Sequence, residues 1–269
     1  MSQQEPRAIT PSNAYHVHVL HKNHFFLKLK LGRFMTGRVI KQERAIRTRA
    51  ALITGAAHEF AKSGFAGATV SKIARNAEVT LGALYFHFPD GKHELARAIV
   101  RGQPDTVTPP LPATGLQRAI DITLTWAWMM LDNPVVLAGA RLVADQDQFL
   151  EMRDNSHAQW TEVISAAFDA AKAQSDVREE VDLQAMARLI VNAATGAQLH
   201  ANMESQMRDL PNRMEETWRC LLPALARPEV IARLSFAEER GRPASAPGGK
   251  SHHPHQSSPG ESGATDGLA

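Results

Sequence analysis

Residues 69–88, with the sequence TVSKIARNAEVTLGALYFHF, decide the fold of this chain. Thr69 and Thr80 belong to the residue types that cap helix N-termini, and each precedes a short apolar segment with helical spacing. Between the two segments, Ala77-Glu78-Val79 fits a tight turn. The pattern predicts a helix-turn-helix, in which the N-terminal residues of the second helix meet base edges in the major groove of DNA.

The second of these helices carries small and apolar residues rather than paired donors. Gly82 and Ala83 permit close approach of the backbone to DNA, and Leu81 or Ala83 can touch a thymine methyl group. The Thr80 hydroxyl can contact a phosphate or a base, and the Tyr85 hydroxyl can donate to a phosphate. With no Arg, Lys, Asn or Gln on this helix, we expect discrimination to depend on apolar contacts and DNA shape. The alternative interpretation is a structural helical hairpin plugged by two phenylalanines, Phe86 and Phe88.

Charge is distributed unevenly along the 269 residues. Residues 1–101 hold 16 Lys and Arg against 6 Asp and Glu, whereas residues 102–269 hold 14 against 22. The excess of basic residues in the N-terminal part and of acidic residues in the rest favours contact between the N-terminal part and a polyanion. Lys92 is a candidate phosphate contact, and the basic residues at the start of the first helix either reach DNA or form a solvated face; these are Lys41, Arg44, Arg47 and Arg49.

Helical periodicity continues through the middle of the chain, and no segment alternates like a strand, so the predicted fold class is all-α. We expect a flexible arm over residues 1–40, a helix-turn-helix domain over 41–89, a ligand-binding and dimerisation domain over 90–235, and a disordered tail over 236–269. Later helices are expected over residues 116–131, 135–144, 157–173, 183–207 and 212–226. Met35 is a candidate alternative translation start, which intact-mass analysis of protein from the native host would test.

Several classes of function find no support in the sequence. The lone cysteine, Cys220, excludes an intrachain disulfide and suits a reducing cytosol. Neither a secretory signal nor a membrane-spanning segment is expected. His58-Glu59 lacks the second histidine of a zinc-protease helix at Lys62, and neither a nucleophile elbow nor a phosphate-binding loop occurs. We therefore expect no enzyme, no cofactor and no metal, including at the histidine-rich segment of residues 16–24.

The chain resembles the TetR family, and within it the γ-butyrolactone receptor branch of antibiotic-producing actinobacteria, over roughly residues 41–235. The resemblance rests on residues 69–74, 79–88, 134–142 and 176–182. Two departures stand out. Branch members often carry Lys where this chain has Leu81, and the segment of residues 89–95 is one residue longer than the common form, which makes the role of Lys92 less certain than that of Tyr85.

The resemblance implies a cytoplasmic homodimer that binds a palindromic double-stranded operator and is released by a lactone, furan or butenolide signal, controlling antibiotic genes. The alternative is a pseudo-receptor or drug-efflux repressor that responds to an antibiotic. The predicted DNA contacts are Thr69, Ser71, Thr80, Leu81, Gly82, Ala83, Tyr85, His87, Lys92 and Arg47. The predicted ligand contacts are Trp160, Gln103, Trp128 and Thr195, although Thr195 would instead bond its own helix if it were purely structural. The dimer seam is expected among Leu189, Ala193, Ala197, Leu222 and Leu225, unless some of these pack within one protomer.

Overall fold

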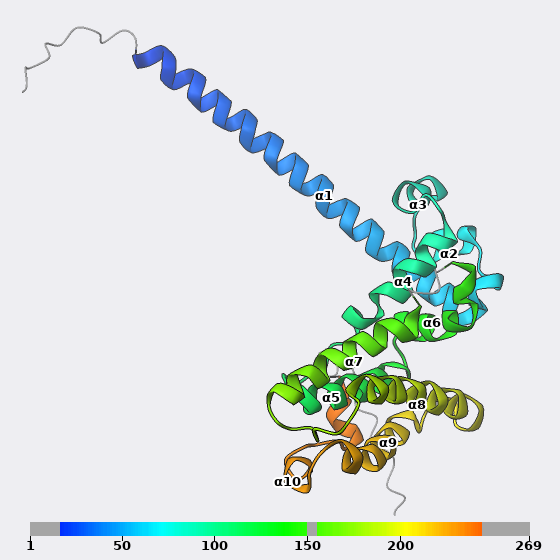
Figure 1. The fold of residues 1–269 in the computed structure, drawn as a ribbon. Coiled ribbons are helices and arrows are strands. Elements are labelled where there is room, and N and C mark those ends of the chain that lie inside the picture. Colours follow the sequence, from blue (N-terminus) through cyan, green and yellow to red (C-terminus); the bar gives the residue numbers. More distant parts are fainter. Residues whose placement is uncertain (1–16, 150–154, 244–269) are drawn as a thin grey trace, which may run out of the picture.

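A computed structural model describes residues 17–149 and 155–243, and every regular element within these ranges is helical (Figure 1), which confirms the all-α class. Helix α1 spans Val17–Gly67. Its regular geometry is interrupted at Gly64, with φ 66° and ψ −176°, a positive φ that glycine adopts without steric penalty. The regular helix therefore breaks at Gly64.

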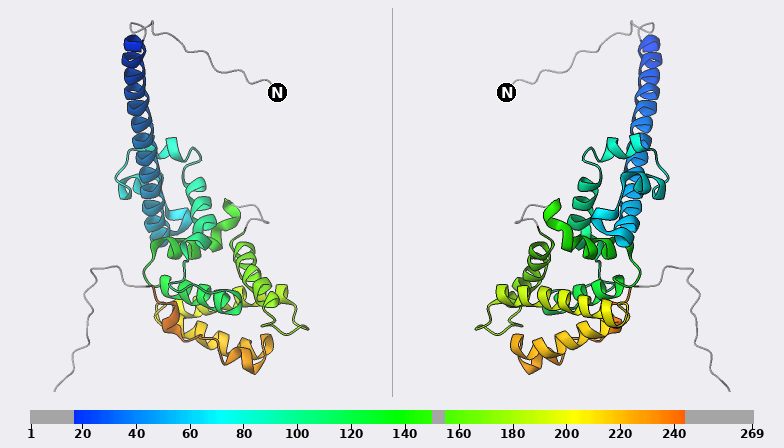
Figure 2. Two further views of the ribbon diagram at one scale, coloured as in Figure 1. Left: turned by 90° about the vertical axis from the view of Figure 1, so that its left-hand side faces the viewer. Right: turned by 90° about the vertical axis from the view of Figure 1, so that its right-hand side faces the viewer.

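The backbone of α1 begins well before Lys41, so residues 17–40 are helical in place of the expected irregular arm. Proline is absent between Val17 and Gly64. The two glycines among residues 17–40, Gly32 and Gly37, disfavour a helix by only about 1 kcal/mol each. Figures 1 and 2 show this part of α1 projecting past α3, on the side away from the C-terminal helices. Residues 1–16 lie outside the described residues.

The N-terminal core is formed where α2 (Val70–Asn76), α3 (Leu81–His87) and α4 (Lys92–Thr106) pack around the C-terminal end of α1. Its largest fully buried side chains include Leu52, Phe60, Ile73, Leu84 and Phe88. Ile46, earlier on α1, is 61% exposed because α1 has left this core by that point. Helix α4 runs through Pro104, because the proline falls in the last turn and removes only one donor.

The C-terminal core is built from α5 (Gly115–Met129), α7 (Ser156–Ala173), α8 (Leu183–Glu204) and α9 (Leu210–Leu225). These helices match the expected ones to within a few residues. Side-chain caps fix three of the helix starts: Asn133 for α6 (Pro134–Leu142), Asn155 for α7 and Asp182 for α8. The 3-10 helix η1 (Val143–Gln148) continues directly from α6.

Helix α6 belongs to both cores. Val136 packs in the C-terminal core, whereas Ala138 and Leu142 pack in the N-terminal core. This explains why PVVLAGARL has so few polar residues: a helix buried on two sides has little surface left to hydrate. A movement of α6 would therefore alter the packing of both cores.

The end of the described chain is ordered where we expected a disordered tail from residue 236. After the short helix α10 (Pro228–Ile231), residues 235–243, here called the C-terminal strap, include the 3-10 helix η3 (Glu238–Gly241) and lie along α5. Arg240 binds the carboxylate of Asp121 through two nitrogens, at 2.6 and 2.9 Å. Composition alone missed this segment because one aromatic residue, Phe236, and a few specific polar contacts hold it. Residues 244–269 lie outside the described residues.

Candidate operator interface and ligand cavity

Two threonine caps position the helix-turn-helix. The Thr69 hydroxyl accepts from the backbone N–H of Lys72 at 3.4 Å, and the Thr80 hydroxyl accepts from that of Ala83 at 3.1 Å. Glu78 has a positive φ of 54° in the turn between α2 and α3. Both predicted caps are therefore present, and the predicted turn lies between them.

The outer face of α3 is largely exposed and carries no Asp, Glu, Lys or Arg. Thr80, Leu81, Gly82 and Tyr85 are exposed, whereas Ala83 and His87 are half-buried. Phe86 is 79% exposed, so the expectation that it plugs the core was wrong. The helical spacing explains the difference, because Leu84 and Phe88 already occupy the inward face and Phe86 falls on the opposite one. Phe86 is therefore a surface aromatic that sequence reasoning missed, in an edge-on contact with the His87 ring.

Lys92 is turned toward α1 rather than held free beside α3. Its ammonium donates to the carbonyl oxygen of Phe65 at 3.2 Å and lies 4.5 Å from the centroid of that residue's ring. Gly91, with φ 56°, makes the tight turn into α4, where a Cβ would lie 3.4 Å from Cε1 of Tyr85. The longer connection thus places the lysine against the end of α1, and its predicted phosphate contact stays a prediction.

The remaining predicted DNA contacts lie on exposed parts of α1 and α2. Arg47 is exposed on α1, as are Lys41 and Arg44, while Thr69 and Ser71 are exposed at the start of α2. Arg49 differs from its neighbours because its guanidinium lies 5.0 Å from the centroid of the Phe88 ring.

A cavity of about 260 Å³ lies in the C-terminal domain. Three of the four predicted ligand residues line it, one each from α4, α7 and α8: Gln103, Trp160 and Thr195. The other lining residues that the structure describes are Ile122, Thr123, Trp126, Ala140, Val143, Ser156, His157, Ile164, Ile190, Val191, Ala194, Gln198 and Leu199.

The fourth predicted residue, Trp128, lies elsewhere. Its indole N–H donates to the carbonyl oxygen of Glu238 at 2.6 Å, and the Arg242 guanidinium lies 4.2 Å from its ring centroid. It therefore anchors the C-terminal strap and does not line the cavity. Trp126, two residues earlier on α5, lines it instead; helical geometry explains the exchange, since residues two apart face different sides.

Two polar contacts shape the cavity wall. The Gln103 side chain is 2% exposed and donates through Nε2 to the Val136 carbonyl oxygen at 3.1 Å, joining α4 to α6. His157 Nε2 lies 3.2 Å from Thr195 Oγ1, which donates to the Val191 carbonyl oxygen at 2.9 Å. The helix bond expected of a structural threonine is thus present, although Thr195 also faces the cavity. His157 was not among the predicted ligand residues. The sequence places it on the helix that becomes α7, but it does not show that Thr195 on α8 lies beside it.

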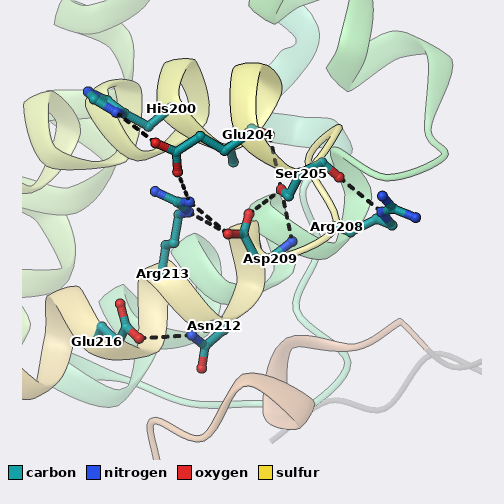
Figure 3. Close-up of polar contacts among 9 residues, drawn as sticks. His200, Glu204, Ser205, Arg208, Asp209, Asn212, Arg213 and Glu216 are labelled. Carbon is teal, nitrogen blue, oxygen red and sulfur yellow. Dashed lines mark hydrogen bonds and ion pairs between the residues drawn. The ribbon is translucent and has the colours of Figure 1, made fainter.

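A polar network closes the turn between α8 and α9 (Figure 3). Arg213 donates to Asp209 Oδ2 at 2.7 and 2.9 Å and to Glu204 Oε2 at 2.5 Å. Hydrogen bonds from Arg213 and then Ser205 lower the pKa of the Asp209 carboxyl group below its ordinary value. These contacts fix the two helices that the sequence assigned to the dimer seam.

The seam prediction is only partly compatible with the structure. Leu222 and Leu225 are 1% and 0% exposed and pack inside the protomer, so neither is available to a partner. Leu189 is exposed, and Ala193 and Ala197 are half-buried along an open groove between α8 and α9. Those three remain candidates for the seam.

Two further findings concern the described residues only. They contain no group of three or more His, Cys, Asp or Glu side chains arranged to hold a metal ion. None of the described helices combines the length and apolar character required to span a bilayer. The histidines of residues 16–24 lie outside the described side chains.

Comparison with known proteins supports this arrangement. Residues 52–99 match the sequence profile of bacterial regulatory proteins of the tetR family, and residues 113–227 match that of tetracyclin repressor-like C-terminal domains. The A-factor receptor protein of Streptomyces griseus is 33% identical over 194 residues, which cover 72% of this chain and 69% of that protein.

Two solved structures extend the comparison. The full-length TetR regulator TylP of Streptomyces fradiae is 31% identical with a TM-score of 0.67, over 74% of this chain and 95% of that one. A gamma-butyrolactone receptor, an ArpA-like protein, is 28% identical with a TM-score of 0.56, over 74% of this chain and 98% of that one. The chain therefore belongs to the TetR family, whose members are DNA-binding regulators that act as dimers and are not enzymes.

Proposed function

We propose that the protein is a ligand-responsive repressor, which leaves a palindromic operator when a γ-butyrolactone-like molecule enters the cavity. The observation that carries this proposal is the position of Gln103. It lies on α4, the helix that leads out of the DNA-binding domain, and it lines the same cavity as Trp160 and Thr195. Similarity to the A-factor receptor protein and to a gamma-butyrolactone receptor supports the lactone and a cytoplasmic role in control of antibiotic genes.

The lining of the cavity favours a neutral and mainly apolar ligand. Among the described residues that form it, none is Asp, Glu, Lys or Arg. An ionised ligand would lose its hydration without gaining a counter-charge, which is strongly unfavourable. Indole and aliphatic surfaces with a few polar fixing points suit a small lactone that carries an alkyl chain.

Ligand occupancy is transmitted through α4 and α6. Ala140 and Val143 line the cavity from α6 and η1, while Ala138 and Leu142 pack against the DNA-binding core. Gln103 ties α4 to the same helix. A ligand that prefers a different arrangement of these helices lowers DNA affinity by the difference in its affinity for the two arrangements.

On the DNA side, we assign base contacts to the exposed face of α3 and phosphate contacts to the exposed residues of α1 and α2. Two copies of α3, about one DNA turn apart, match a palindromic operator. Helices α8 and α9 form the seam between protomers, where Leu189 and Met203 are 46% and 72% exposed. An apolar face of this kind is stabilised by burial against its symmetry mate.

A gel-shift experiment with matched tryptophan variants tests the proposal. Wild-type dimer should bind a palindrome near its own gene with a steep salt dependence, and a γ-butyrolactone should release it. Trp160→Leu should retain DNA binding and lose release, whereas Trp128→Phe, outside the cavity, should retain both. Release by an antibiotic and by no lactone, furan or butenolide would identify a pseudo-receptor or efflux-type repressor instead.

A further inference from the structure

The hydroxyl group of Thr195 has one hydrogen, and that hydrogen is already engaged. Thr195 Oγ1 lies 2.9 Å from the Val191 carbonyl oxygen and 3.2 Å from His157 Nε2. If the hydroxyl donates to Val191, then His157 Nε2–H donates to it. If His157 is the other tautomer, the hydroxyl donates to Nε2. In both arrangements a lone pair on Oγ1 remains, and no hydrogen does.

The hydroxyl hydrogen of Thr123, the second threonine in the cavity wall, is also engaged in a hydrogen bond. Thr123 Oγ1 donates to the Ile120 carbonyl oxygen at 2.9 Å and accepts from the Trp218 indole N–H at 2.7 Å. Thr123 is 7% exposed, whereas Thr195 is half-buried. Both threonines therefore offer acceptors to a ligand, and Thr195 is the more accessible of the two.

We propose that Thr195, with its hydroxyl held by His157, selects ligands that donate a hydrogen bond. This inference rests on the proposed function and names the ligand more closely: a lactone with a free hydroxyl on its side chain, rather than the matching ketone or the deoxy compound. A ketone oxygen at this position would face a lone pair. A deoxy ligand would shield the remaining lone pair of Oγ1 from water without donating a hydrogen bond to it.

Three probes that differ only at one side-chain carbon test the selection: a 2-alkyl-γ-butyrolactone with a hydroxyl there, the ketone and the deoxy compound. Binding is measured without DNA, by quenching of tryptophan fluorescence, and with DNA, by release of the operator. Because an unsatisfied buried partner weakens binding by one to two orders of magnitude, the hydroxyl probe should bind wild type roughly 10- to 100-fold more tightly than the other two.

Variants at Thr195 separate selection from folding. In Thr195→Val the preference should fall to about 1-fold, and in Thr195→Ser it should persist, since only the first removes the acceptor. Thr161→Val is the matched control, because Thr161 Oγ1 also donates to its own helix, to the His157 carbonyl oxygen at 2.7 Å, but does not line the cavity. It should keep the preference.

The outcomes distinguish the two levels of the proposal. Equal affinity for all three probes, a preference for the ketone, or a preference that survives Thr195→Val would overturn the role of Thr195 and leave the lactone receptor intact. If operator-competent wild type binds none of the three probes, the lactone receptor itself is refuted, together with this inference.

Discussion

Substitution of Gly139 by alanine tests how closely α4 and α6 are joined. A Cβ at position 139 would lie 1.8 Å from Nε2 of Gln103 and 2.1 Å from its Cδ. Gln103 is 2% exposed, so its amide has little space into which it can move. Overpacking and loss of the hydrogen bond to Val136 together should lower the free energy of unfolding by about 3 kcal/mol, or ~6–12 °C in melting temperature.

A double-mutant cycle assigns that loss to its cause. Gln103→Ala alone should destabilise the protein by removing a buried hydrogen bond. Adding Gly139→Ala to it should cause no further loss, because the new methyl group occupies the space that the amide left, giving a coupling energy of about 2 kcal/mol or more. Melting is measured at one fixed dimer concentration, since protomer association contributes to stability.

Gly102→Ala is the control for the glycine replacement itself. It neighbours Gln103 on α4, and a Cβ there would meet nothing within 4 Å, so it should stabilise the helix by about 0.5–1 kcal/mol. The reasoning is refuted if Gly139→Ala melts within about 2 °C of wild type, or if the double variant loses the sum of the two single losses.

Three other substitutions have expected outcomes. Arg240→Gln strips a 1%-exposed carboxylate, Asp121, of its charged partner and should cost about 3 kcal/mol in urea unfolding. Arg219→Gln removes a side chain that is 64% exposed and also lies over the Phe236 ring, so it should cost under about 1 kcal/mol. Burial, followed by neighbouring carboxylates, raises the pKa of Glu238 above 4.5. Its ionised form is thus disfavoured in the folded state, and stability is lost as pH rises through the raised pKa, so Glu238→Gln should raise the melting temperature at pH 7 and not at pH 4. Phe86→Ala should weaken operator binding in fluorescence anisotropy without lowering the melting temperature, because its ring is 79% exposed.

Each of these has a contrary result. A loss for Arg240→Gln no larger than that for Arg219→Gln would show that the pair of Arg240 and Asp121 contributes little to the fold. An equal gain for Glu238→Gln at both pH values would assign its effect to packing rather than to ionisation. Unchanged operator affinity for Phe86→Ala would remove that ring from the DNA interface.

The sequence was sufficient where a local rule decides the structure. Thr69 and Thr80 cap their helices as predicted because an N-cap depends on a few neighbouring backbone groups. The helices of the C-terminal domain follow from apolar spacing alone, to within a few residues. Three of the four predicted cavity residues lie together, although the choice of Trp160 came from family resemblance and not from spacing.

The sequence predictions were wrong where residues distant in the sequence determine the structure. Phe86 and Phe88 are both aromatic and close in sequence, and only the packing of α3 shows that one is exposed and the other buried. For the same reason, Trp128 was predicted to line the cavity, whereas Trp126 lines it. The C-terminal strap is held by Arg240 against Asp121, 119 positions apart, and no local signal indicates such a pair.

The position of α6 explains how so small a cavity governs a distant DNA surface. The interior of a protein is close-packed, so a ligand displaces the wall of its cavity rather than compressing it. One face of α6 meets the cavity through Ala140, and another packs in the DNA-binding core through Leu142. Because α4 is tied to the same helix by Gln103, the proposed function requires α4 and α6 to shift together when the cavity fills. On this proposal, the spacing of the two recognition helices changes without any ligand contact near α3.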